Sequence, residues 1–579
     1  MTPAGGAPAA GGLLAPDVPV VPDAVDELGR WRLRPGVRVT ALRDGLHLRG
    51  WAGSVTLEGS GALPGLWRLV EEALRTDGGA AALASRAPAG SALRAALCTL
   101  IGGLRAHDLL VGNAPVPRSP AAGWLGAAAE RPERAARALR RARVRVEGPE
   151  PGPGGALAGA AVRALEGCGV RAAAVAGGER WLLLTAEAGG GEPLAVAAGV
   201  GGGTGFVTPA GDPGRVRADA AALVVRLRIT GGEGEEGGGG ELAELVAGAA
   251  VQRLLCAVGG LPDPDGGESG GRVSVLVADG RPLRARYRPW TGSRPAAGGG
   301  PLTLEGALAS VAELGDERVG VLAPPLPGSL PQLPVALVGC ASAGGDLVAG
   351  AVRADLARLE AVCRAAELRL GGGREGVVVG AGDAHALGRA LRRGALRAAV
   401  GGGEGMTDPG PPDHPQARYW WSVLTGRLGV GARLSVARLG PGVFRAVVEE
   451  GAAGGPGGRV LGRAVEATAA DAVAFAALAS VVRVRARERD PAARWIAASG
   501  GAVAALASAG VERAGWEDEC WTAGWLAAVA GRESALHTAL GRRAGVRVAE
   551  FGAAGGGGRL GAALRECGFT VLDIGGGSR

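Results

Sequence analysis

The alternation of apolar and polar residues is clearest between Trp31 and Leu104, where it predicts three strands followed by three helices. Apolar residues stand at every second position on both sides of Asp44-Gly45, a strong β-hairpin signal because both turn positions favour positive φ. Val55–Leu57 adds a third short strand, and an Ala-rich segment at Gly79–Leu83 separates two longer helical stripes. The first stripe is Leu63, Leu66, Leu69, Val70, Ala73 and Leu74, and the second, with Ser91 as its N-cap, is Leu93, Leu97, Leu100, Ile101 and Leu104. This order is typical of a small winged-helix-like module.

Three uses of such a module are compatible with its residues. Reading DNA would require base-contacting side chains on the last helix, whose polar positions are only Arg94, Thr99 and Arg105. Binding an extended peptide would add a strand beside Val55–Leu57 and pack it against the last helix. The candidate peptide-binding residues are Ser54, Val55, Thr56, Leu57, Leu93, Leu97, Leu100, Ile101 and Leu104. The third use is packing alone, and the residues leave these readings open, with DNA ranked last.

A second domain is predicted from a strand, glycine-rich turn, helix and strand in succession. Val144–Val146 and Val170–Val175 are the strands, and the helix covers 156–165. This is the skeleton of a nucleotide-binding βαβ unit. Pro149, Pro151 and Pro153 remove backbone N–H donors from the turn, and no well-placed Asp follows the second strand. We therefore expect a folded domain that binds no nucleotide.

The last ~290 residues alternate helical and strand patterns, which indicates an α/β or α+β domain. Strands are expected at Val335–Gly339, Arg433–Val436, Val443–Val448 and Phe569–Ile574, and helices at Val352–Leu370, Asp383–Ala399, Ala464–Arg485 and Arg559–Cys567. The predicted organisation is a mobile tail at 1–28, the winged module at 29–113, a linker at 114–135, the second domain at 136–285 and the third at 286–579. The fold class is multidomain α/β and α+β.

Composition narrows the function classes only slightly. The 579 residues include 108 glycines, 36 prolines and no lysine, but 47% of residues are apolar, so the chain can fold. A net charge of +7 is small for this length and argues weakly for nucleic acid. The seven cysteines are scattered without a Cys-x-x-Cys pair, which favours reduced thiols in a cytoplasmic protein without a zinc site. No signal peptide is evident, and the apolar run at 467–482 is expected to be a buried helix, not a membrane span.

The order of these parts resembles the azoline-forming cyclodehydratase machinery that modifies ribosomal peptides into thiazole- or oxazole-containing products such as thiopeptides. The winged module is similar to its leader-peptide recognition element. Residues 136–285 resemble its ThiF-like, Rossmann-type domain through Val144–Gly155, Gly203–Pro209, and Leu254–Gly260 leading to Val273–Asp279. Residues 286–579 resemble a YcaO domain through Leu330–Pro334, Glu360–Leu370 and Gly462–Arg485.

The departures from that family suggest a chain without catalytic residues. The YcaO pattern implies two glutamates and an Arg on one helix face, which bind Mg²⁺ and ATP phosphates. At Cys363–Leu368 only Glu367 corresponds to such an acid, because Arg364 and Leu368 stand where the other acid and the Arg are expected. A further family glutamate, on the later helix, is expected around Ala479-Ser480. The paired cysteines common in ThiF-like relatives and the Pro-rich C-terminal tail are also missing. The resemblance thus implies a degenerate YcaO-like domain, with no catalytic or metal residues and no cofactor of its own.

Three functions follow, in order of preference. The first is a leader-binding partner that presents Cys, Ser and Thr of a precursor peptide to a separate ATP- and Mg-using YcaO enzyme. An azoline dehydrogenase and a second copy of the chain are further candidate partners, and no nucleic acid or membrane is expected. The second is a complete ATP-dependent cyclodehydratase, which would need Glu367, Asp383, Glu449 and Glu450 as ligands. The third, a winged-helix transcription regulator, ranks last. The five histidines lack informative partners, and Trp420-Trp421 is read as core.

Overall fold

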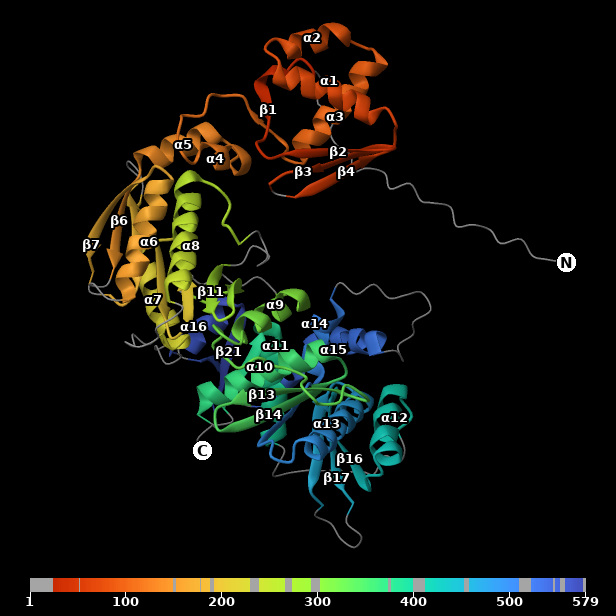
Figure 1. Cartoon of the computed structure of the whole chain (residues 1–579). Coiled ribbons are helices and arrows are strands. Elements are labelled where there is room, and N and C mark those ends of the chain that lie inside the picture. Colours follow the sequence, from red (N-terminus) through yellow and green to blue (C-terminus); the bar gives the residue numbers. More distant parts are fainter. Residues whose placement is uncertain are drawn as a thin grey trace, which may run out of the picture. The chain divides into compact units, whose positions relative to one another are not determined.

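The structure is a computed structural model that describes residues 24–51, 53–148, 153–177, 179–187, 192–229, 239–265, 273–292, 302–372, 376–398, 412–451, 458–509, 522–544, 547–551 and 558–575. The chain divides into two units, Met1–Gly271 with Val275–Tyr287, and Arg272–Ser274 with Arg288–Arg579. The division lies close to the expected boundary at 285/286. Figure 1 shows the elements of each unit.

The first part of unit 1 is the predicted module of three strands and three helices, which we call the winged module (residues 24–113). An antiparallel sheet in the order β2-β3-β4 is covered by the helices, and α3 lies across it (Figure 1). The bounds are β2 Arg38–Leu42, β3 Gly45–Arg49, β4 Ser54–Glu58, α1 Leu63–Arg75, α2 Gly79–Arg86 and α3 Ala92–Ala106. A separate antiparallel pair, β1 Trp31–Leu33 with β5 Leu110–Gly112, follows the short 3-10 helix Leu28–Arg30. Ser91 caps α3 as predicted, since its hydroxyl accepts a hydrogen bond from the Arg94 backbone N–H at 3.2 Å.

Two local predictions in this module need correction. Leu42 pairs with Gly45, so the hairpin turn is Arg43-Asp44 and Gly45 begins β3. Glycine is required there because a Cβ would lie 2.3 Å from the Leu57 carbonyl oxygen of β4. The predicted mobile tail, residues 1–28, extends too far toward the C-terminus, because Ala24, Val25 and Leu28 are fully buried in the core of the module. Residues 1–23 lie outside the described part.

The expected linker at 114–135 contains packed helices. Helices α4 (Ala122–Ala128) and α5 (Pro132–Arg141) contribute Leu125 and Leu139 to the core of the domain that follows. Arg34 of the winged module reaches the C-terminal end of α4. Its guanidinium donates to the Ala129 carbonyl at 2.7 Å and the Asp108 carboxylate at 2.6 Å, with longer bonds to the carbonyls of Gly126 and Ala127.

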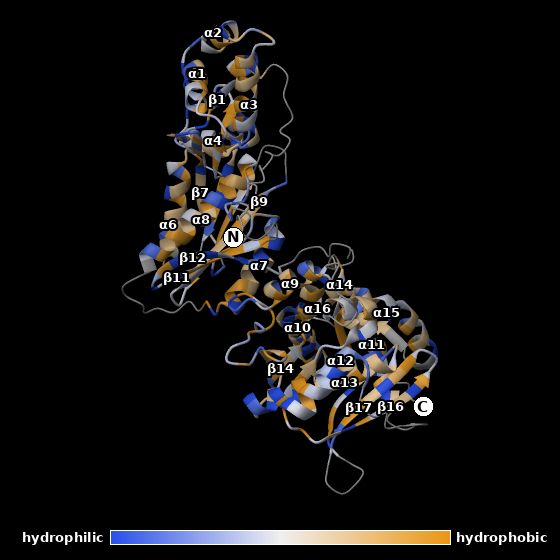
Figure 2. Ribbon diagram, turned by 90° about the vertical axis from the view of Figure 1, so that its right-hand side faces the viewer, coloured by the Kyte–Doolittle hydropathy of each residue, from blue (hydrophilic) through white to orange (hydrophobic). Residues whose placement is uncertain are grey.

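A seven-stranded sheet in the order β12-β11-β10-β9-β8-β6-β7 forms the second domain. Its strands are β6 Arg143–Gly148, β7 Arg171–Ala176, β8 Leu182–Glu187, β9 Leu194–Gly201, β10 Thr204–Val207, β11 Ser274–Gly280 and β12 Leu283–Pro289. Its helices are α6 Pro153–Gly167, α7 Pro213–Arg226 and α8 Gly239–Gly259. Apolar residues are dense along α8 and its neighbouring strands (Figure 2), and α6 and α8 supply most of the helical core residues.

This sheet departs from the expected Rossmann-type arrangement. The predicted βαβ unit is present, because β6 and β7 pair in parallel around α6. However, β6–β8, β8–β9, β9–β10 and β10–β11 are antiparallel. Parallel strands need a crossover of a dozen or more residues, whereas β9 and β10 are joined only by Gly202 and Gly203, both with positive φ.

One described helix, in the window Gly240–Gly259 of α8, is long and apolar enough to cross a membrane by length and composition. Its apolar residues Leu242, Val246, Ala250 and Leu254 are buried against the sheet.

Unit 2 is an α+β arrangement of three small sheets and several helices. The sheets are β13-β14-β19, β15-β21-β20 and β16-β17-β18, with a parallel pair between β14 and β19. The strands are β13 Ala336–Ser342, β14 Gly345–Ala351, β15 Val377–Ala381, β16 Ala432–Gly440, β17 Val443–Glu450, β18 Val460–Glu466, β19 Trp495–Ala498, β20 Arg547–Glu550 and β21 Phe569–Gly575. The helices are α9 Leu304–Leu314, α10 Ala354–Gly371, α11 Asp383–Ala398, α12 Pro415–Ser422, the π-helix Val423–Arg427, α13 Ala469–Arg489, the 3-10 helix Gly501–Val503, α14 Ala504–Ser508, α15 Thr522–Ala544 and α16 Gly558–Glu566.

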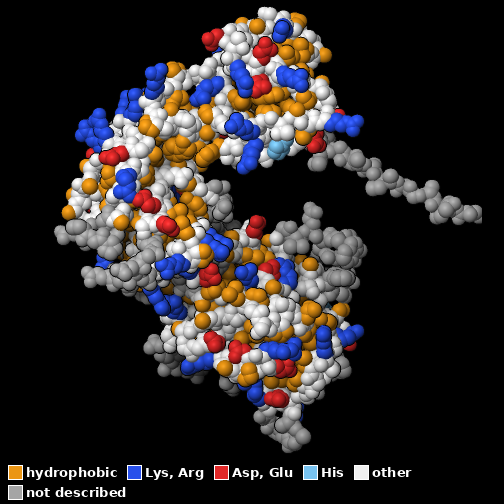
Figure 3. Space-filling model, in the orientation of Figure 1, with side chains coloured by type: hydrophobic (Ala, Val, Ile, Leu, Met, Phe, Trp, Pro, Cys, Tyr) orange, Lys and Arg blue, Asp and Glu red, His pale blue; other side chains and the backbone are white. Residues whose placement is uncertain are grey.

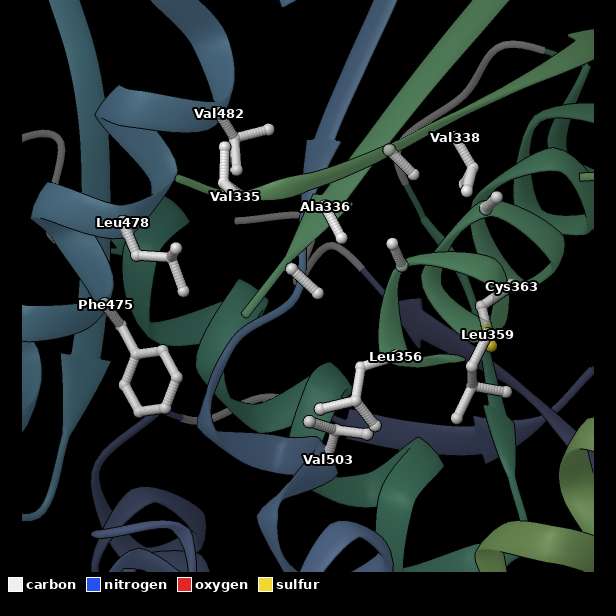
Figure 4. Close-up of a cluster of buried hydrophobic side chains, with 14 of the residues drawn as sticks. Val335, Ala336, Val338, Leu356, Leu359, Cys363, Phe475, Leu478, Val482 and Val503 are labelled. Carbon is white, nitrogen blue, oxygen red and sulfur yellow. The ribbon is translucent and has the colours of Figure 1, made fainter. Parts of the chain in front are cut away.

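Two buried helices organise this unit. Figure 4 shows Leu356, Leu359 and Cys363 of α10 on one side of the core, and Phe475 and Leu478 of α13 on the other. Both were predicted, but α13 begins later than expected. Residues 464–466 end strand β18, and Thr468 caps the helix by accepting from the Asp471 backbone N–H.

Candidate functional site

Strand β4 is an edge strand with one side free among the described residues. It pairs only with β3, so the hydrogen-bonding groups on its other side have no strand partner in the described part of the chain. Ser54, Thr56 and Glu58 are exposed on the outer face, and Thr56 is hydrogen-bonded to His47 of β3 at 2.9 Å. Val55 and Leu57 are half-buried and belong to the edge of the core. This arrangement can accept an extended peptide as an additional strand.

The predicted residues of α3 occupy a different position from those of β4. Leu97, Leu100, Ile101 and Leu104 are fully buried in the core of the winged module, and Leu93 packs against it. The structure therefore places Val55 and Leu57 beside the open edge but puts these α3 side chains beneath it, where they hold the helix in place.

Small residues line one face of α3, and one of them, Gly103, approaches β4. Ala96, Thr99 and Gly103 follow each other at helical spacing and are half-buried or exposed. A methyl group added at Gly103 would contact only Leu57, at 4.0 Å. At this point the helix and the edge strand approach each other through a glycine and a leucine side chain. Gly103, a glycine inside the predicted helix, is the feature of the sequence that could have indicated this close approach.

Unit 2 contains a cavity of about 180 Å³ between α10, α11, β18 and α13. Its ionisable lining residues are Glu360, His385, Arg389, Arg392, Arg393, Arg463 and Glu466. Most of these are buried. Such a concentration of ionisable groups in a cavity is a candidate site.

The acids at one end of the cavity are paired with arginines. Arg389 of α11 binds Glu360 through both terminal nitrogens, and its Nη2 also donates to Glu367 Oε1 at 2.9 Å. Glu367 is fully buried, receives further bonds from Arg364 and Arg393, and does not line the cavity. Burial alone would raise the pKa of Glu367, but the surrounding arginines outweigh it and lower that pKa to about 2.

A second network of arginine and glutamate side chains lies at the other end of the cavity. Arg392 holds Glu466 of β18 and Glu533 of α15, with two bonds to each carboxylate. Burial raises the pKa of Glu466 above its ordinary value despite this pairing. The pKa of Glu533 is lowered to about 2, because hydrogen bonds from Arg392 and His537 outweigh its burial.

These carboxylates do not fit a magnesium nucleotide. Mg²⁺ requires free oxygen ligands in octahedral geometry, whereas both oxygens of Glu360 and of Glu466 already accept bonds from guanidinium groups. The other acids considered for a complete enzyme are not assembled with them. Asp383 begins α11 and accepts from Thr570, and Glu449 and Glu450 end β17. Among the described residues no group of three His, Cys, Asp or Glu is placed to hold a metal.

Residues 149–152 of the predicted glycine-rich turn lie outside the described part of the chain. The same holds for Cys520, while the six described cysteines are free thiols. Burial raises the pKa of Cys363 beneath the arginine cluster and of Cys256 and Cys340, the last two to about 11, so these thiols are poor nucleophiles.

Comparison with solved structures identifies a related architecture. No family model matches the chain, and no curated protein sequence matches it. A solved "Heterocyclase in complex with substrate and Cofactor" is 12% identical, with a TM-score of 0.52 and 94% of both chains covered. The heterocyclase TruD is also 12% identical, with a TM-score of 0.44 and 95% of both chains covered. The chain thus has a heterocyclase-like fold along nearly its whole length.

Proposed function

We propose that this chain is the leader-peptide-binding partner of an azoline-forming cyclodehydratase of ribosomal-peptide biosynthesis. The observation that carries the proposal is the open edge of β4, because it offers backbone hydrogen bonds to an extended leader. The chain presents Cys, Ser and Thr residues of the precursor to a separate ATP-dependent YcaO enzyme in the cytoplasm. The middle and C-terminal parts correspond to the ThiF-like and degenerate YcaO-like domains of that machinery.

The pairing in the unit 2 cavity supports a role without catalysis. ATP-dependent cyclodehydration transfers phosphoryl charge, which needs a metal ion and cationic groups directed at the phosphates. Arg389 and Arg392 are instead engaged by buried glutamates of the same chain. ATP and Mg²⁺ are accordingly assigned to the partner enzyme. An azoline dehydrogenase and a second copy of this chain are further proposed partners.

A complete cyclodehydratase is the second candidate. The full-length likeness to a solved heterocyclase favours it, since that protein was captured with substrate and cofactor. This function would require the arginine–glutamate pairs at the cavity to separate when nucleotide binds.

The decisive experiment uses the full chain with a short Cys/Ser/Thr-rich precursor peptide and a YcaO enzyme, each sought among the genes beside its own. Leader affinity is measured by fluorescence anisotropy, and ATP turnover is measured with Mg²⁺ and precursor, with and without the neighbouring YcaO enzyme. We expect micromolar or tighter leader binding, with turnover only when the YcaO enzyme is added. Absence of leader binding would overturn the proposal, and turnover by this chain alone would establish the second candidate.

A further inference from the structure

The outer face of the winged sheet carries opposite charges at its two ends. Strand pairing places Arg49 of β3 opposite Ser54, at the start of β4. At the other end, Glu58 closes β4 opposite Gly45. Both charged side chains are exposed, and neither has an ion-pair partner among the described residues. Arginines are spread over the surface of this unit (Figure 3), so the single acid on β4 marks one end of the edge.

The reach of these side chains decides which can contact an added strand. A strand beside β4 would lie about 5 Å from β4 and roughly 10 Å from β3. Glu58 is on β4 and would be next to the added strand. Arg49 lies one strand further away, but its long side chain can pass over the small Ser54. Arg38, paired with Arg49 on β2, is too distant for contact and adds only to the positive potential.

We propose that the leader segment bound at β4 carries its charges in a fixed order. The N-terminal end of its bound strand is basic or neutral, and the C-terminal end is acidic. This inference rests on the proposed function. The rest of the sheet is antiparallel, and antiparallel pairing is the more stable kind, so the C-terminal end of the added strand lies beside Ser54 and Arg49. Its inward side chains lie beside Val55 and Leu57, where apolar groups are favoured because these two residues pack against the core.

An exposed aromatic side chain lies at the Ser54 end of β4. Trp51, in the turn before β4, has 64% of its surface exposed, which is unusual for so large an apolar group. A chain leaving the Ser54 end of the edge would cover it.

Two synthetic peptides of identical composition test the charge order. One contains Arg-Leu-Thr-Leu-Asp and the other Asp-Leu-Thr-Leu-Arg, each with the same Gly-Ser flanks and a fluorescein label. We expect the full chain to bind the first about fivefold more tightly, a difference of about 1 kcal/mol, because its charges meet opposite charges at both ends of β4. The double variant Arg49→Glu/Glu58→Arg should reverse this preference.

The matched control is Arg43→Glu, which changes the same residue type in the same hairpin at the turn between β2 and β3. It should keep the original preference, and thermal melting checks that every variant is folded. Equal affinity for the two peptides, or a preference that survives the double variant, would overturn the inference while leaving leader binding intact. Failure of both peptides and of the co-encoded precursor to bind would overturn the proposed function itself.

Discussion

Arg392 binds Glu466 through two parallel hydrogen bonds, Nε to Oε1 at 3.0 Å and Nη2 to Oε2 at 2.7 Å. Both side chains are buried, and the same guanidinium also holds Glu533. Removing one partner of such a buried ion pair lowers the free energy of unfolding, because the remaining charge is buried without either its partner or water.

Removal of this arginine should strongly destabilise unit 2. Arg392→Gln leaves two buried carboxylates without their cation, and we expect a loss of about 3–5 kcal/mol in the free energy of unfolding. Urea denaturation followed by circular dichroism measures it. The control is Arg75→Gln, which removes an exposed pair with Glu71 and should cost less than about 1 kcal/mol. Equal losses in the two variants would show that the Arg392 network does not stabilise the fold.

Stability should fall as pH drops below neutrality because of His385. Burial, with the nearby charge of Arg389, lowers the pKa of this imidazole from 6.5 to about 3, and its Nδ1 accepts the Ala381 backbone N–H. The unfolded state therefore binds a proton that the folded state excludes, so the stabilisation is complete above pH 6.5 and is lost progressively toward pH 3.

The loss should reach roughly 1–2 kcal/mol near pH 5, measured by urea denaturation across the pH range. His385→Gln should flatten this slope, whereas His107→Gln, at an exposed position, should retain it. An unchanged slope in His385→Gln would exclude this residue as the cause. Below about pH 4.5 the depressed pKa values of Glu367 and Glu533 add a further loss of the same sign.

A substitution at Gly103 should block the proposed peptide site at the edge of β4 without unfolding the winged module. Gly103→Ala should stabilise it by about 0.5–1 kcal/mol, since a methyl meets only Leu57 and glycine is a poor helix former. Gly103→Leu should place a large side chain against Leu57 of the edge strand and weaken leader binding at least roughly tenfold, a cost of about 1.4 kcal/mol. Anisotropy titration measures binding, and Ala82→Leu on the exposed face of α2 is the control. Undiminished binding by Gly103→Leu would place the peptide elsewhere.

A buried hydroxyl in the seven-stranded sheet gives a prediction for the second domain. Thr208 is fully buried, and its Oγ1 accepts the Ala197 backbone N–H at 2.9 Å. Thr208→Val keeps the shape but leaves that donor unpaired, so we expect a loss of about 1–3 kcal/mol in urea denaturation. Thr99→Val removes an exposed hydroxyl and should change stability little. An unchanged free energy of unfolding in Thr208→Val would mean that the Ala197 N–H finds another acceptor.

The winged module could be predicted because its signals are local. Alternation over a few residues, a two-residue turn and the Ser91 cap are all decided by near neighbours. The role of each α3 leucine could not be predicted. Leu97 and Leu104 form a stripe that suits either a core or a binding surface, and only the position of β4 distinguishes the two.

The arginine–glutamate networks were missed because their partners are far apart in sequence. Arg389 is 29 residues from Glu360, and Arg392 is 141 residues from Glu533. Glu367, the acid that matches the family pattern, is fully buried, whereas Glu360, about two turns earlier on α10, lines the cavity. The antiparallel middle sheet was missed for a related reason, since a βαβ signal fixes one parallel pair and says nothing of the strands that follow.

The contacts of Arg34 have a mechanical consequence. One buried guanidinium joins the winged module to the C-terminal end of α4 through several hydrogen bonds. Any tilt of the module away from α4 has to break them together. The orientation of the winged module relative to α4 is therefore held by a side chain as well as by the connecting backbone.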